Sequence, residues 1–99
     1  KAQASTLIKL GTLQRSLGRE ADAAESYRLA AESDPASWEA QYNLGVTHLE
    51  NGQPRQALEA LARAEQQGGA ERPEVALALA TAHDQLAQPQ HRDAVGQRC

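Results

Sequence analysis

The sequence has no Phe and no Met, a single Trp (Trp38) and only two Tyr (Tyr27 and Tyr42). Compact globular cores usually gain much of their volume from aromatic side chains, so this scarcity disfavours one bulky central core. The apolar residues are instead mainly Ala and Leu, which are strong helix formers. The composition therefore predicts an all-α protein whose helices pack closely through small side chains.

Clustered basic charge and long apolar runs are also lacking. The chain has 10 Lys and Arg against 13 Asp and Glu, a net charge of −3, which argues against a nucleic-acid partner. No apolar run approaches the roughly 20 residues of a membrane span, so we expect none. Because the chain begins with Lys1 and shows no leader segment, we expect a fragment or a processed chain. The abundance of Ala, Arg and Gln is typical of a GC-rich bacterial genome.

Side chains that could support catalysis or metal binding are few and isolated. His48 and His83 have no Cys or His close by on the same helix face, so we expect packing or solvated roles. Cys99, the single cysteine, cannot form an internal disulfide, and its terminal position is a poor place to hold a nucleophile beside a base. The compartment, cytoplasm or periplasm, stays open. We expect neither an enzyme nor a bound metal or other cofactor.

What the sequence does contain is an internal repeat. Five landmark residues return 34 positions later: Leu10, Gly11, Gly18, Ala23 and Ala30 recur as Leu44, Gly45, Gly52, Ala57 and Ala64. A partial third unit follows at a step of 35 residues, one residue having been added near Gly68-Gly69.

Apolar spacing within each unit predicts a pair of helices. In the first unit Leu7, Leu10, Leu13 and Leu17 form one stripe at intervals of three and four residues. Gly18 then predicts the end of that helix, because Gly is favoured just past a helix C-terminus. The same reasoning predicts helices over residues 4–17, 21–33, 37–51, 55–67 and 73–87, and a short last helix after Pro89.

A 34-residue helix–turn–helix unit that carries Leu-Gly, Gly, Ala, an aromatic residue, Ala and Pro resembles the tetratricopeptide repeat family. The first unit has the whole pattern, the second has Leu61 for the aromatic residue and Gly69 for Pro, and the third has Ala80 and Ala87 at the glycine positions. The resemblance implies a right-handed α-solenoid of antiparallel helix pairs, about two and a half repeat units. The chain would then form one module over residues 1–99, with units of about 4–37, 38–72 and 73–99, the last one partial.

The resemblance also implies a protein–protein interaction module. In this family the first helix of each unit lines a concave groove that takes an extended peptide or a helix of a partner. The positions that correspond to the groove are Ile8, Thr12, Arg15, Glu39, Tyr42, Asn43, Val46, Leu49, Leu77 and Thr81. Tyr42, Val46 and Leu49 share one helix face. They are either the apolar floor of the groove or contacts with the neighbouring helix.

One branch of the family holds the C-terminal carboxylate of its partners in a polar clamp. The corresponding positions here are Ile8, Thr12, Asn43, Glu74 and Ala78. Only Asn43 fits, and a clamp needs positive charge to offset a carboxylate. The predicted groove instead offers the acidic side chains of Glu39, Glu50, Glu74 and Asp84. These favour a neutral or basic ligand segment.

Three functions are compatible with such a module. It could be an adaptor or scaffold that binds a segment of another protein. It could be the repeat portion of a larger enzyme or of a secretion or assembly protein, where it positions substrate or subunits. It could also form a homo-oligomer through its end units, since we expect Leu7 and Ile8 to be exposed at one end and no polar capping helix is evident at the other.

Overall fold

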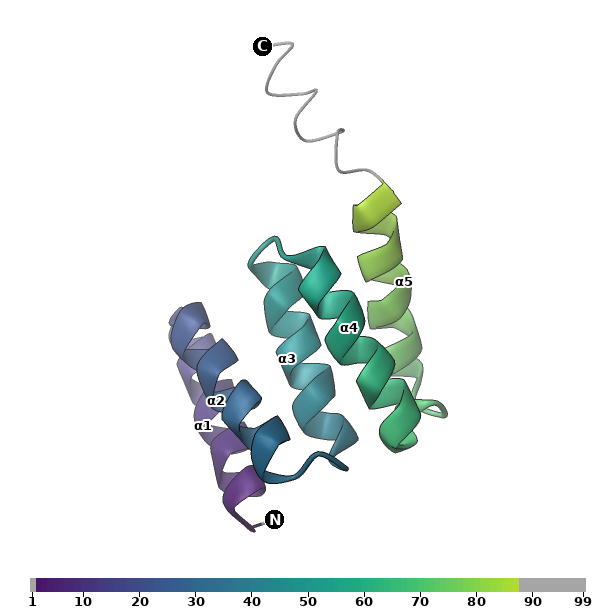
Figure 1. Ribbon diagram of the computed structural model, residues 1–99. Coiled ribbons are helices and arrows are strands. Elements are labelled where there is room, and N and C mark those ends of the chain that lie inside the picture. Colours follow the sequence, from purple (N-terminus) through teal and green to yellow (C-terminus); the bar gives the residue numbers. More distant parts are fainter. Residues whose placement is uncertain (1, 88–99) are drawn as a thin grey trace, which may run out of the picture.

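The computed structural model describes residues 2–87, and within them it contains five α-helices and no strand. The helices follow one another side by side in chain order (Figure 1). Their bounds are α1 Ala2–Ser16, α2 Glu20–Ser33, α3 Trp38–Glu50, α4 Pro54–Ala64 and α5 Pro73–Ala87, with a short π-helical turn, η1, at Glu65–Gly69. The five predicted helices are confirmed. The short helix predicted after Pro89, and Cys99, lie outside the described residues.

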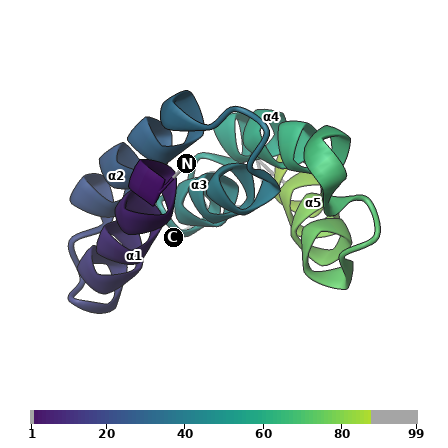
Figure 2. The same cartoon turned by 90° about the horizontal axis from the view of Figure 1, so that it is seen from below.

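The helices form an arch, as predicted for an all-α solenoid. Figure 2 shows α1, α3 and α5 along the inner side of the arch and α2 and α4 along the outer side. α1 and α3 are each followed by an outer helix that packs against them, and the next inner helix packs on that outer one. The inner helices therefore share one concave face.

The turns inside the two helix pairs are set by glycine. Gly18 and Gly52 have φ angles of +80° and +74°, in the left-handed region that side chains other than glycine rarely adopt. In the first turn the Arg19 N–H donates to the Gln14 carbonyl at 2.8 Å, and in the second the Gln53 N–H donates to the His48 carbonyl at 2.8 Å. Both turns are thus Schellman caps, which satisfy the last carbonyls of α1 and α3.

The end of α4 differs from the prediction. The helix was expected to reach residue 67, but regular α-helix ends at Ala64 and the π-helical turn η1 follows. Gly68 has a φ angle of +105°, and a Cβ atom at Gly69 would lie only 2.7 Å from the Ala64 carbonyl oxygen. Gln67 and Gly68 do not have helical φ and ψ angles, so the chain is kinked within η1. The residue that lengthens the second step of the repeat to 35 lies in this segment.

Two small clusters replace a single core. The first joins Ala4, Ala30, Ala31 and Ala40, with Leu7 and Ile8 packed against it. The second joins Ala57, Leu61, Ala78 and Ala82. Alanine predominates in both, so the helix axes can approach closely, as the composition predicts.

The Leu-Gly landmark of each repeat has a direct structural cause. A Cβ atom at Gly11 would lie 2.7 Å from Cε1 of Tyr27, and one at Gly45 would lie 2.6 Å from Cγ of Leu61. In each pair a large side chain of the outer helix thus rests on the bare backbone of the inner helix. Tyr27 and Leu61, which occupy equivalent positions 34 residues apart, are fully buried as a result.

Most of the apolar stripe of the first helix does not face α2. Ala4 and Gly11 make the buried side of α1, whereas Leu10, Leu13 and Leu17 are exposed. The expectation that Leu7 and Ile8 are exposed at this end is wrong, because both are half-buried against the first core cluster. Small residues, together with Leu7 and Ile8, therefore form the contacts of α1.

Candidate functional site

The residues predicted to line the groove all lie on the three inner helices. They are Ile8, Thr12 and Arg15 on α1, Glu39, Tyr42, Asn43, Val46 and Leu49 on α3, and Leu77 and Thr81 on α5. Their surroundings divide them into side chains that are held by the fold and side chains that are free.

The apolar residues of α3 belong to the first kind. Tyr42, Val46 and Leu49 are half-buried, and all three pack against the second core cluster. Each therefore contacts neighbouring helices and also keeps part of its surface open. These side chains can therefore pack against the neighbouring helices and also form the floor of a groove. Because the core holds each side chain in one orientation, its exposed part is fixed as well.

Arg15 and Glu50 connect two inner helices. Nε of Arg15 lies 3.1 Å from Oε1 of Glu50, and Nη2 of Arg15 donates to Oε2 of Glu50 at 3.2 Å. Burial lowers the pKa of the Arg15 guanidinium, but a hydrogen bond with Tyr27 and the charge of Glu50 raise it, and the raised direction prevails. The pair joins α1 to α3 and neutralises one of the four acidic groups of the predicted groove.

Thr12 is tied to the outer helix. Its hydroxyl donates to the Ile8 carbonyl at 2.9 Å. The same oxygen lies 2.9 Å from the Tyr27 hydroxyl. Because the Thr12 proton is used within α1, the Tyr27 hydroxyl donates to Thr12. Tyr27 thus reaches from α2 to the inner helix.

The free side chains are mostly polar. Glu39, Leu77 and Thr81 are exposed, and the Thr81 hydroxyl donates only within its own helix, to the Leu77 carbonyl at 3.0 Å. Within residues 2–87 the Glu39 carboxylate makes no ion pair. A shallow hollow of about 300 Å³ opens between Ile8 and Glu39. A second one, of about 220 Å³, lies beside Thr12 and Arg15.

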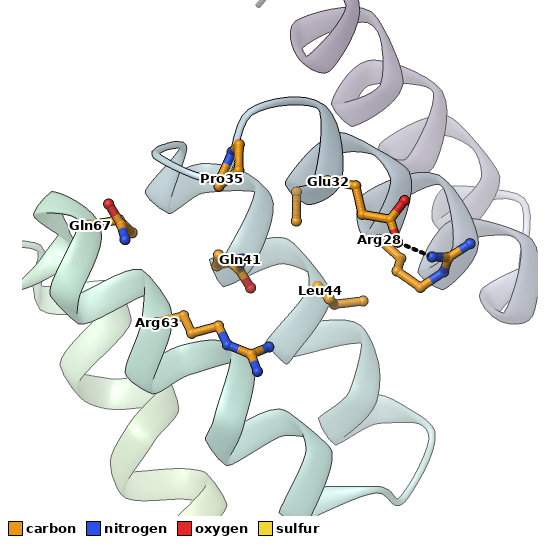
Figure 3. Close-up of a pocket in the computed structure, with 8 residues that line it drawn as sticks. Arg28, Glu32, Pro35, Gln41, Leu44, Arg63 and Gln67 are labelled. Atoms are coloured by element: carbon orange, nitrogen blue, oxygen red, sulfur yellow. Dashed lines mark hydrogen bonds and ion pairs between the residues drawn. The ribbon is translucent and has the colours of Figure 1, made fainter.

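A different pocket, the outer pocket, lies between α2 and α4 with α3 as its floor (Figure 3). Sequence analysis did not single it out. Its volume is about 360 Å³, and Arg28, Gln41 and Arg63 are among its lining residues. Arg28 forms ion pairs with Glu25 and Glu32. The hydrogen bond from Arg28 lowers the pKa of the Glu25 carboxyl. The one signal in the sequence is a polar residue, Gln41, at the repeat position that Leu7 occupies in the first unit.

Gln41 leads to a stability prediction. It is only 7% exposed, and its Oε1 atom is buried without a hydrogen-bond partner in the described part of the chain. A buried, unpaired amide oxygen costs about 1–3 kcal/mol. Gln41→Leu, which has a similar volume, should raise the free energy of unfolding by about 1 kcal/mol in urea denaturation. Gln56→Leu, at an exposed position, is the control and should change it by less than about 0.5 kcal/mol. A Gln41→Leu variant less stable than wild type would show that the amide is paired in solution.

The two histidines of the described residues, His48 and His83, add no site. His48 is half-buried, and its Nδ1 atom lies 2.9 Å from Oε1 of Gln53. His83 is exposed. Among residues 2–87 no three His, Cys, Asp or Glu side chains gather in a way that could hold a metal ion. None of the described helices is both long enough and apolar enough to cross a membrane.

Comparison with known proteins identifies the repeat. A family model described as a tetratricopeptide repeat matches residues 14–82, which include all of α2, α3 and α4 and parts of α1 and α5. A comparison with curated proteins found no match. The matched stretch covers well over half of the chain.

Proposed function

The chain belongs to the tetratricopeptide repeat family, and from this premise we propose that it binds a peptide or a helix of a partner protein on its concave face. Repeats of this family are generally protein-interaction modules and typically are not catalytic. We accordingly propose an adaptor or scaffold role without an enzymatic activity of its own.

The observation that carries this proposal is the packing of α3. Tyr42, Val46 and Leu49 are anchored against the second core cluster, yet each remains partly exposed on an inner helix. Binding sites gain affinity when their side chains are already fixed, because less conformational entropy is lost on association. Apolar side chains of a ligand would therefore meet a rigid surface.

The charge of the face indicates which ligand fits. The Arg15–Glu50 ion pair is internally neutral. Glu39 and Glu74 are exposed, and neither forms an ion pair within the described residues. We therefore propose a segment that combines apolar side chains with Lys or Arg. Its binding should weaken as salt increases, because exposed charges are screened.

Peptide selection tests this proposal. Peptides would be selected from a random library on the immobilised wild-type protein, and the affinity of the best one would be measured by fluorescence polarisation. The double variant Glu39→Lys, Thr81→Arg changes two exposed side chains, so its helicity should be unchanged in circular dichroism. We expect it to weaken binding at least about tenfold, because it replaces attraction by repulsion and adds bulk.

The matched control is Arg63→Glu, an exposed charge reversal in the pocket between α2 and α4. It should bind the peptide as wild type does. Equal binding by the double variant and wild type, or enrichment of no peptide at all, contradicts the proposal. A loss confined to Arg63→Glu would move the site to the outer pocket.

A further inference from the structure

The outer pocket contains a buried polar group that the fold leaves unpaired. The Gln41 side chain lies at its floor, and Oε1 of Gln41 is buried without a hydrogen-bond partner among residues 2–87. Figure 3 shows this oxygen on the side of the pocket where Arg63 and Leu44 lie. An unpaired buried acceptor destabilises the fold. A ligand that brings a hydrogen-bond donor into the pocket would remove this cost.

Arg63 is a second unpaired group of the same pocket. It is exposed on α4 and forms no ion pair or hydrogen bond in the part of the chain that the structure describes. The other guanidinium of the pocket, that of Arg28, is already balanced by Glu25 and Glu32. Arg63 is therefore the positive charge of this pocket that is available to a ligand.

The repeat shows that these two polar residues depart from the pattern of the chain. Gln41 and Arg63 stand at the positions that Leu7 and Leu29 occupy 34 residues earlier. Both leucines line a hollow of the first helix pair whose volume, about 360 Å³, equals that of the outer pocket. Leucine thus serves at both positions where only packing is needed. The two polar residues in the second unit indicate that the outer pocket has a further role.

We propose that the outer pocket binds an Asp or Glu side chain of an extended segment of a partner protein. The carboxylate pairs with the Arg63 guanidinium, whose planar fork can donate two parallel N–H bonds to it. A backbone N–H of the segment donates to Oε1 of Gln41. A phosphate group fits less well, because it carries up to two negative charges and would lie near Glu32.

A second hollow favours a protein segment over a small molecule. It has a volume of about 350 Å³, shares Arg28 and Leu44 with the outer pocket, and extends to Ala21 and Ala24. The two hollows together follow the 14 residues of α2, a length of roughly 21 Å at 1.5 Å per residue. About six residues of an extended chain span that distance. The alanines leave room for a small apolar side chain next to the acidic one.

Peptide selection with a depletion step tests this site separately from the proposed groove. A random peptide library would first be depleted on the immobilised Arg63→Glu variant, which removes ligands of the inner helices, and then selected on wild type. We expect the recovered peptides to share an Asp or Glu. Exchange of that residue for Asn or Gln should weaken binding at least about tenfold in fluorescence polarisation, because the charge-assisted hydrogen bonds are lost. Recovery of no peptide, or of peptides without a shared acidic residue, overturns the proposal.

Two variants test the roles of the pocket residues. Arg63→Gln should weaken binding of the selected peptide at least about tenfold. Gln41→Leu should weaken it roughly three- to tenfold although we expect this variant to be more stable, whereas a purely structural role of Gln41 would leave the affinity unchanged. Arg55→Gln, at an exposed position of α4 outside the pocket, is the matched control and should bind as wild type does. Circular dichroism should show equal helicity for all of them. Wild-type affinity of Arg63→Gln or Gln41→Leu, or an equal loss in Arg55→Gln, overturns the proposal.

Discussion

Tyr27→Ala should lower the free energy of unfolding by about 3–5 kcal/mol, the cost of removing a large aromatic side chain from a closed site. Tyr27 is fully buried. Its ring lies on the backbone of Gly11, and its hydroxyl bonds to Thr12. Gly11, on which the ring lies, has no side chain that could fill the space. For a domain of this size the change removes a large part of the total stability.

Urea denaturation followed by circular dichroism measures this change. Tyr27→Phe, which removes only the hydroxyl, is the control and should cost about 1 kcal/mol. Because repeat proteins are stabilised by contacts between neighbours, the loss should be local. Hydrogen exchange should therefore show that α1 and α2 lose protection before α4 does. An alanine variant within about 1 kcal/mol of wild type would mean that the ring does not hold the pair together.

Gly45→Ala should lower the free energy of unfolding by about 1–3 kcal/mol, although alanine is the better helix former. The new Cβ atom would lie 2.6 Å from Cγ of Leu61 and 3.2 Å from the Ala57 carbonyl oxygen. The first distance is far too short and the second is only tight, so the clash is mainly with the Leu61 side chain, which would push α3 and α4 apart. The cost comes from overpacking and not from a lost contact.

A double-mutant cycle isolates that cause. Leu61→Ala alone should cost about 2–5 kcal/mol, because it leaves a cavity. In the Leu61→Ala background the side chain that opposes the new methyl group is gone, so Gly45→Ala should be close to neutral. The coupling would then be about 1–3 kcal/mol. If Gly45→Ala lowered the free energy of unfolding equally in wild type and in the Leu61→Ala variant, the contact with Leu61 would not require this glycine.

Most of the fold could be predicted from local signals. Gly18 and Gly52 mark the ends of α1 and α3 because the Schellman cap needs a positive φ angle that glycine adopts without strain. The end of α4 could not be predicted in the same way. There the additional residue was visible as a step of 35, but the kink within η1 depends on the packing of Gly69 against the Ala64 carbonyl oxygen.

The candidate site could be predicted only as far as the resemblance to the family reaches. The resemblance implies ten residues on the inner helices, but it does not give the contacts between helices that decide their roles. The contact of Tyr42 and Leu49 with the second core cluster depends on residues of α4 and α5 far along the chain. The Arg15–Glu50 ion pair likewise joins two repeats.

The outward direction of the α1 stripe is a related case. Leucine spacing gives an apolar side of the helix but does not say what that side contacts. In α1 the small residues Gly11 and Ala4 are the ones that pack against neighbouring helices. Leu10, Leu13 and Leu17 of α1 are exposed instead. Their outward direction follows from the arrangement of the helices and not from their spacing.

The central claim is that a partner segment lies on the inner helices. The most direct measurement is a titration of the isotope-labelled chain with the selected peptide, followed by the amide resonances in two-dimensional NMR. We predict shifts that concentrate on α1, α3 and α5, at Thr12, Glu39 and Val46 above all. Shifts confined to α2 and α4, around Arg28 and Arg63, would contradict the account and place the partner in the outer pocket.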